Sequence, residues 1–159
     1  MPMIEVKLIK PKRGLVDAKQ LRQVIDAVYQ ETATGIRNDL RKATASWDTP
    51  VKIDIFRPPT GGFYIVVNSK IFELVDKGAK PHYITPVAAR YLRFASDFKP
   101  KTKPRTLSSS SGGKSGEQVL AKKVRHPGFE GRQFLKTAQD KWQGTMVRRM
   151  NQRLEDLTR

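Results

Sequence analysis

The chain has 159 residues, of which 38% are hydrophobic and 29% are charged, so its size and composition are those of one folded domain. It contains no cysteine, which excludes disulfides, thiolate metal sites and thiol redox chemistry. The net charge of +16 predicts an anionic partner: nucleic acid, an acidic protein surface or a membrane face.

The first half of the chain is predicted to hold a strand, a long helix and a β-hairpin. Residues 4–9 alternate apolar and polar side chains, as a strand does. Asp17 occupies the N-cap position of a helix, and apolar residues at helical spacing carry that helix to about residue 46. From residue 51 the hydrophobic period changes to two, and a Pro-Gly-rich turn at 57–62 divides the run. We therefore predict an antiparallel hairpin over 51–67.

The middle of the chain is predicted to hold a short helix and several short strands. Asn68 and Ser69 can cap a helix that ends at Gly78 and that Pro81 prevents from continuing. Strands are expected at 83–84, closed by Pro86, at 92–94 and at 119–124. Between them, residues 97–118 are dominated by Lys, Pro, Ser, Thr and Gly and have no apolar core of their own.

The last element is a long helix that follows the turn at residues 126–128. Its apolar stripe consists of Phe134, Leu135, Ala138, Trp142, Met146, Met150, Leu154 and Leu157. The predicted fold is α+β: a long N-terminal helix, a small mostly antiparallel sheet covered on one face by helices, and a long C-terminal helix. We expect a single domain over 1–159, with an extended, flexible, hairpin-like arm at about 97–118.

The residues do not form a recognisable catalytic constellation. The only two histidines, His82 and His126, have no second histidine or carboxylate at a metal-binding interval, and the carboxylates are scattered. The Ser-Gly-rich stretch at 108–115 lacks the first glycine of a P-loop. We therefore expect no enzyme, no cofactor and no metal. The N-terminus lacks the apolar stretch of a signal peptide, and no window reaches the length of a membrane span, so no membrane partner is expected.

Basic residues are concentrated around the arm and near the end of the last helix. The arm set is Lys99, Lys101, Lys103, Arg105, Lys114, Lys122, Lys123 and Arg125, and the helix set is Arg148, Arg149 and Arg153. Either set could be merely solvated, and the helix set also complements the helix dipole. The alternative is contact with DNA phosphates or with an acidic neighbouring subunit. Aromatic residues are not interleaved with the arm charges, so base stacking is not expected.

Two segments resemble a known family. The first runs from Leu74 through Gly78 to His82-Tyr83-Ile84-Thr85-Pro86, and the second from Val124 through His126-Pro127-Gly128 to Arg132-Gln133-Phe134-Leu135. Together they resemble the neck and tail-completion proteins of long-tailed phages, the group that includes the minor tail protein Z of lambda. The chain departs from the family at Val75 to Ala79, where Glu-Phe-Gly-Thr is often found, and in its long basic arm.

The resemblance implies a structural virion protein that completes the tail or joins it to the head. It implies a homo-oligomeric ring, expected to be a hexamer, around the DNA channel at the head-proximal end of the tail. Its neighbours would be head-closure or connector proteins and tail-terminator or tail-tube proteins, and its contact with DNA would be non-specific. Turns at Gly78, His82, Pro86, His126, Pro127 and Gly128 would place the arm. The alternatives are a free basic protein that binds the nucleic-acid backbone and, less favoured by the residues, a toxin or nuclease.

Overall fold

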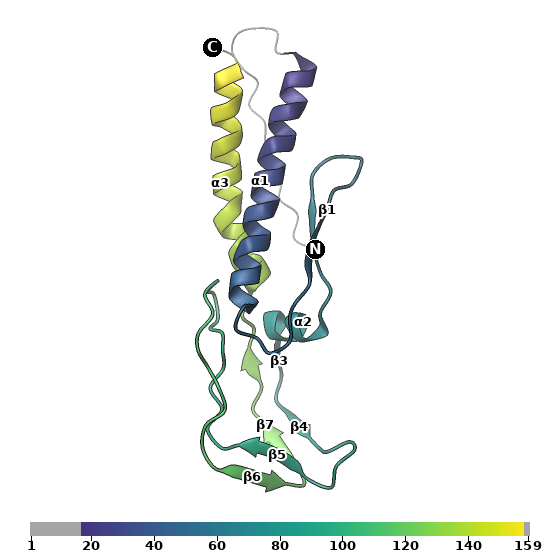
Figure 1. Cartoon of the computed structure of the whole chain (residues 1–159), viewed down its shortest axis with the longest axis vertical. Coiled ribbons are helices and arrows are strands. Elements are labelled where there is room, and N and C mark those ends of the chain that lie inside the picture. Colours follow the sequence, from purple (N-terminus) through teal and green to yellow (C-terminus); the bar gives the residue numbers. More distant parts are fainter. Residues whose placement is uncertain (1–16, 158–159) are drawn as a thin grey trace. The chain divides into compact units, whose positions relative to one another are not determined.

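The computed structural model of the chain describes residues 17–157, so the strand predicted at 4–9 lies outside the described residues. The helices are α1 (Ala18–Thr44), α2 (Lys70–Lys77) and α3 (Phe134–Leu157). The strands are β1 (Ile53–Phe56), β2 (Tyr64–Val67), β3 (Gly78–Ala79), β4 (His82–Ile84), β5 (Leu92–Ala95), β6 (Gln118–Ala121), β7 (Val124–His126) and β8 (Phe129–Glu130). The α+β arrangement with a long helix near each end is confirmed, and every named strand pair is antiparallel (Figure 1).

The strands do not join into the one small sheet that the sequence predicts. They form four separate two-stranded sheets: β1 with β2, β3 with β8, β4 with β7, and β5 with β6. The described residues also divide into two compact units. Unit 1 contains residues 17–41, 52–68 and 135–157, and unit 2 contains residues 42–51 and 69–134. Each unit has its own buried residues and is described separately below.

Unit 1 is built on the side-by-side packing of α1 and α3, which run antiparallel (Figure 1). Asp17 caps α1 as predicted, because its side chain accepts a hydrogen bond from the Lys19 N–H at 3.1 Å. Val28 of α1 and Met146 and Met150 of α3 are buried together. These residues belong to the two predicted apolar stripes, so the sequence pattern identified the contact face of each helix.

A glycine in the middle of α1 allows the two helices of unit 1 to approach closely. The indole of Trp142 lies so close to Gly35 that a Cβ there would collide with the ring. One turn further on, Asp39 accepts a hydrogen bond from Trp142 Nε1 at 2.7 Å and pairs with Lys141 at 2.7 Å. The carboxylate therefore satisfies the indole N–H that the apolar stripe places at the helix contact.

The predicted hairpin over 51–67 is confirmed. β1 and β2 pair in register from Ile53 opposite Val67 to Phe56 opposite Tyr64, and Ile53 is fully buried. The hairpin packs on α1 within unit 1. The ring of Phe63 meets the ring of Tyr29 edge-on at 6.1 Å, and the Arg57 guanidinium donates to the Asp26 carbonyl at 2.9 Å.

Unit 2 contains a short helix, α2, whose ends are those the sequence predicts. Ser69 is the N-cap of α2 and accepts a hydrogen bond from the Phe72 N–H at 3.1 Å. Gly78 ends the helix with φ of 85°. Three aromatic rings contact one another with centroids 5.6–6.2 Å apart: Trp47, Phe72 of α2 and Phe134. Phe72 and Phe134 are buried. This aromatic cluster is the core of the unit.

Two of the small sheets are pieces of one antiparallel ladder. β3 pairs Gly78 with Glu130, β4 pairs His82 with His126, and the register between the two sheets does not shift. That register places Pro81 opposite Pro127. Neither proline has an N–H to donate, so the ladder must break there. Residues 78–84 and 124–130 are thus the two strands of a single interrupted ribbon.

The prediction of a single strand at 119–124 is wrong, because this segment belongs to two strands. Its first part is β6, which pairs with β5 from Leu92 opposite Ala121 to Ala95 opposite Gln118. Its second part is β7, which pairs with β4. Lys122 and Lys123 separate the two strands because the chain changes pairing partner at this point. Apolar alternation alone carries no information on which partner a strand takes.

Gly78 provides a test of the ladder's first pair. A Cβ at Gly78 would lie 2.5 Å from the Gly131 nitrogen and 2.6 Å from the Phe129 carbonyl oxygen, in addition to the strain of a positive φ. We expect Gly78→Ala to lower the free energy of unfolding by at least about 2 kcal/mol, measured by urea denaturation. Gly61→Ala is the control, because Gly61 has φ of 95° but nothing within 4 Å of the added Cβ. Equal losses in both variants would contradict a close contact at Gly78.

Candidate interaction surface

The positive charge of the chain is concentrated in unit 2. This unit carries 15 Lys and Arg residues against 6 Asp and Glu, whereas the described part of unit 1 carries 11 against 8. Eight of the eleven basic residues predicted as contact candidates lie in unit 2, between Lys99 and Arg125. Unit 2 therefore carries most of the excess positive charge of the described residues.

The basic arm predicted at 97–118 forms a hairpin-like excursion that is closed by its own hydrogen bonds. The Lys99 N–H donates to the Gly113 carbonyl at 3.0 Å, and the Ser110 N–H donates to the Lys101 carbonyl at 2.7 Å. Next to the second of these bonds, toward the tip of the excursion, Thr102 pairs with Ser109 and is buried. The hairpin-like character predicted for this segment is confirmed, and the segment has a buried residue that its polar composition does not indicate.

Side chains and backbone also fasten the excursion to the rest of unit 2. Lys101 makes a 2.7 Å ion pair with Asp48, and Arg105 makes a 3.0 Å ion pair with Glu130. The Arg105 N–H donates to the Arg132 carbonyl at 2.9 Å. Lys101 and Arg105 are therefore partly neutralised within the fold. The remaining arm candidates have exposed side chains: Lys99, Lys103, Lys114, Lys122, Lys123 and Arg125.

The β4–β7 ribbon has one cationic face that includes an aromatic ring. Tyr83 stands directly opposite Arg125, and the Lys123 ammonium lies 4.0 Å from the centre of the Tyr83 ring. Cross-strand partners point to the same face, so all three side chains share it. Along the sequence, no aromatic residue stands among the arm charges from Lys99 to Arg125, but this face has one. Strand pairing places Tyr83 there although it is distant from Arg125 along the chain.

Residues predicted to form turns make local contacts at one end of the β4–β7 pairing. His82 and His126 face each other across β4 and β7 with ring centroids 5.0 Å apart. The Lys80 carbonyl lies 2.8 Å from His82 Nδ1, and His126 Nδ1 accepts a hydrogen bond from the Gly128 N–H at 3.0 Å. Gly128 has φ of 82°. Both imidazoles thus hold local turns, Pro127 sits within the second turn, and Pro86 is half-buried after β4.

Large apolar side chains are exposed on both faces of the β5–β6 ribbon. Phe94 and Val119, which are cross-strand partners, lie on one face, and Leu120, opposite Arg93, lies on the other. Leu120 is 65% exposed. Tyr83 and Ile84 of β4 and Val87 beyond it are exposed as well. These large apolar side chains therefore meet solvent in the isolated chain.

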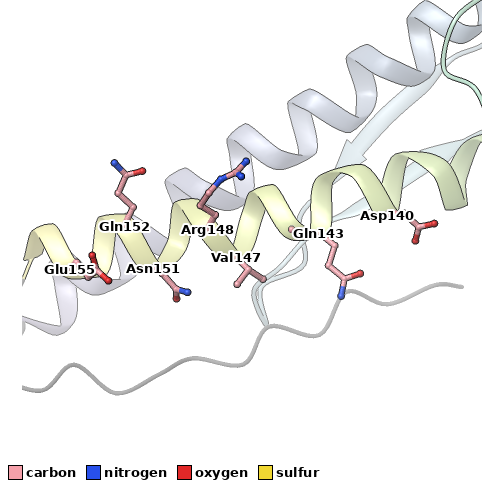
Figure 2. Close-up of a pocket in the computed structure, with 8 residues that line it drawn as sticks. Asp140, Gln143, Val147, Arg148, Asn151, Gln152 and Glu155 are labelled. Atoms are coloured by element: carbon pink, nitrogen blue, oxygen red, sulfur yellow. The ribbon is translucent and has the colours of Figure 1, made fainter.

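The basic set near the end of α3 is divided between internal pairing and solvent. Arg149 and Arg153 both pair with Glu31 of α1, so they contribute to the helix contact of unit 1. Arg148 is exposed and lines a polar hollow along α3 together with Asp140, Asn151 and Glu155 (Figure 2). Acidic and amide side chains line the same hollow. Ion pairs among residues 17–157 engage two of the eight basic residues in the arm set and two of the three in the helix set.

Among residues 17–157, three or more His, Asp or Glu side chains do not come together in a way that could hold a metal ion. No helix in that range is long and apolar enough to cross a bilayer. Comparisons with protein-family models, with curated proteins and with solved structures returned no match.

The Lys101–Asp48 pair gives a pH-dependent test of how the excursion is held. The hydrogen bond and the charge of Lys101 lower the pKa of Asp48 below its ordinary value of 3.8, and Lys114 adds a smaller effect. Because the folded-state pKa is lowered, the pair stabilises the fold above the ordinary pKa and this contribution is lost as the pH falls through the folded-state pKa.

We expect NMR titration of the Asp48 carboxyl to give a lowered pKa in the native chain and a value near the ordinary one in Lys101→Gln. Lys103→Gln, which changes a neighbouring exposed lysine, serves as the control and should leave the Asp48 pKa low. An ordinary pKa for Asp48 in the native chain would contradict the pairing. Added salt should raise the pKa, since the Asp48 side chain is exposed and its charge is screened.

Proposed function

We propose that this chain is a non-enzymatic structural subunit of a phage neck, acting in tail completion or head–tail joining. In this proposal it assembles as a ring at the head-proximal end of the tail, around the DNA channel, and contacts the adjacent neck and tail proteins. The observation that carries the proposal is the apolar surface that the ribbons of unit 2 leave uncovered. The resemblance of residues 74–86 and 124–135 to the neck family points in the same direction.

The exposed ribbons are better explained by assembly than by an isolated monomer. A two-stranded ribbon is marginally stable alone, and β5–β6 exposes Phe94 and Val119 on one face and Leu120 on the other. Among residues 17–157, each strand of a two-stranded sheet also has one edge without a strand partner, and open edges favour pairing with another chain. A subunit that repeats a heterologous contact around an axis covers such surfaces in every copy.

The charge of unit 2 fits a position beside DNA. Exposed lysines and arginines that meet phosphates hold a duplex without reading its sequence. The six exposed arm residues, from Lys99 to Arg125, are suited to that contact, or to contact with an acidic neighbouring subunit. The cationic face around Tyr83 also suits the alternative function, a free protein that binds the nucleic-acid backbone. The location of the protein in the cell separates these two functions.

Immunogold electron microscopy of purified particles from the source tests the proposed function. With an antibody against this chain, we expect label confined to the head–tail junction. Heads and tails from a strain that lacks the gene should accumulate unjoined and carry no label. Label absent from particles, with the protein recovered on intracellular DNA, would overturn the proposal and favour the free nucleic-acid-binding protein.

Leu120→Ser tests whether the β5–β6 ribbon is the assembly surface. Leu120 is exposed in the isolated chain, so the substitution should change its free energy of unfolding by less than about 0.5 kcal/mol. We expect at least a tenfold loss of joined particles in a complementation assay, because the apolar contact is removed only in the assembled state. Leu74→Ser, at an equally apolar and half-exposed position of α2, is the matched control. Normal joining of heads to tails by the Leu120→Ser variant would contradict a role of this ribbon in the assembly interface.

A further inference from the structure

Unit 2 contains a cavity of about 500 Å³ that the proposed function does not use. Its walls come from the loop after α1, from α2, from the start of the basic excursion and from the β7–β8 segment. Apolar side chains line most of it: Trp47, Ile71, Val75, Phe98, Pro100 and Phe129. This volume and this lining are typical of pockets that take a ligand, and the space exceeds that of one side chain.

The polar groups of the cavity leave one cation without a counterion. Lys101 and Arg132 both line it, but Lys101 is already paired with Asp48 at 2.7 Å. Arg132 has no ion pair with a carboxylate among residues 17–157, and its Nε is buried without a hydrogen-bond partner. A buried guanidinium nitrogen without an acceptor is costly, and a carboxylate is the acceptor that matches its geometry.

We propose that this cavity binds a segment of a partner protein in which an aromatic or large apolar side chain stands next to an Asp or Glu. The apolar side chain fills the space beside Trp47 and Phe129, and the carboxylate pairs with Arg132. A protein segment is favoured over a small metabolite because the rim continues outward as exposed apolar surface. Ile71 is 51% exposed and Phe98 is 59% exposed, and a partner's surface would cover both. The inference stands on the cavity and does not rest on the neck assignment.

Peptide titration of the full-length chain tests this inference. The probes are the capped pentapeptides Ser-Phe-Glu-Leu-Ser and Ser-Phe-Gln-Leu-Ser, which differ only in the charge of one side chain. The chain has two tryptophans, so two indole N–H signals report separately in an NMR spectrum. We expect saturable shifts of the Trp47 signal with a millimolar or lower Kd and no shift of Trp142. The Glu peptide should bind at least fivefold more tightly than the Gln peptide.

Single substitutions test whether the peptides bind in this cavity. Arg132→Gln should abolish the preference for the Glu peptide, whereas Arg148→Gln, the same change at an exposed arginine of α3, should preserve it. If Arg132→Gln fails to fold, Phe98→Ser at the exposed rim replaces it and should weaken both peptides by at least threefold. The inference is overturned by equal binding of the two peptides, by no Trp47 shift at 10 mM peptide, or by benzoate alone binding as tightly as the Glu peptide.

Discussion

The structure of unit 2 depends on one interrupted antiparallel ladder. Residues 78–84 pair with residues 124–130 at constant register, from Gly78 opposite Glu130 to Ile84 opposite Val124. Backbone hydrogen bonds from Arg132 and Gln133 to Val75 and Asp76 extend the contact toward the aromatic cluster. Everything between the two strands, including β5, β6 and the basic excursion, is one long insertion whose ends this ladder holds together.

The ladder explains why the charged and apolar surfaces of unit 2 occur together. It sets Tyr83 opposite Arg125, and the change of pairing partner at Lys122 and Lys123 turns the chain from β6 into β7. The same geometry leaves the β5–β6 ribbon without a third strand or a covering helix within the unit. Cations and large apolar side chains therefore occur together in the ribbons of unit 2. This combination suits a partner surface that is both apolar and acidic, or a partner that holds DNA nearby.

Local signals in the sequence predicted the helices and strands well. They predicted poorly which residues far apart in the chain come into contact. Asp17, Ser69 and Gly78 fixed helix ends because caps are satisfied by bonds within a few residues. The stripes of α1 and α3 identified Val28, Met146 and Met150 because helical periodicity records which face is buried. The contacts of Gly35 with Trp142 and of Lys101 with Asp48 join residues far apart in sequence, and no local pattern encodes them.

The exposed apolar residues of the ribbons carry the strongest argument about function. Leu120, Phe94 and Ile84 have the β-propensity of buried strands, yet short two-stranded ribbons offer no second layer to bury them. Phe72 and Phe134 in the same unit show that the chain does bury large side chains where a helix covers them. Exposure in the ribbons is thus a property of the isolated chain. In the proposed assembly, a neighbouring subunit supplies the layer that covers Leu120 and Phe94, and its surface has to accommodate the lysines and arginines beside them.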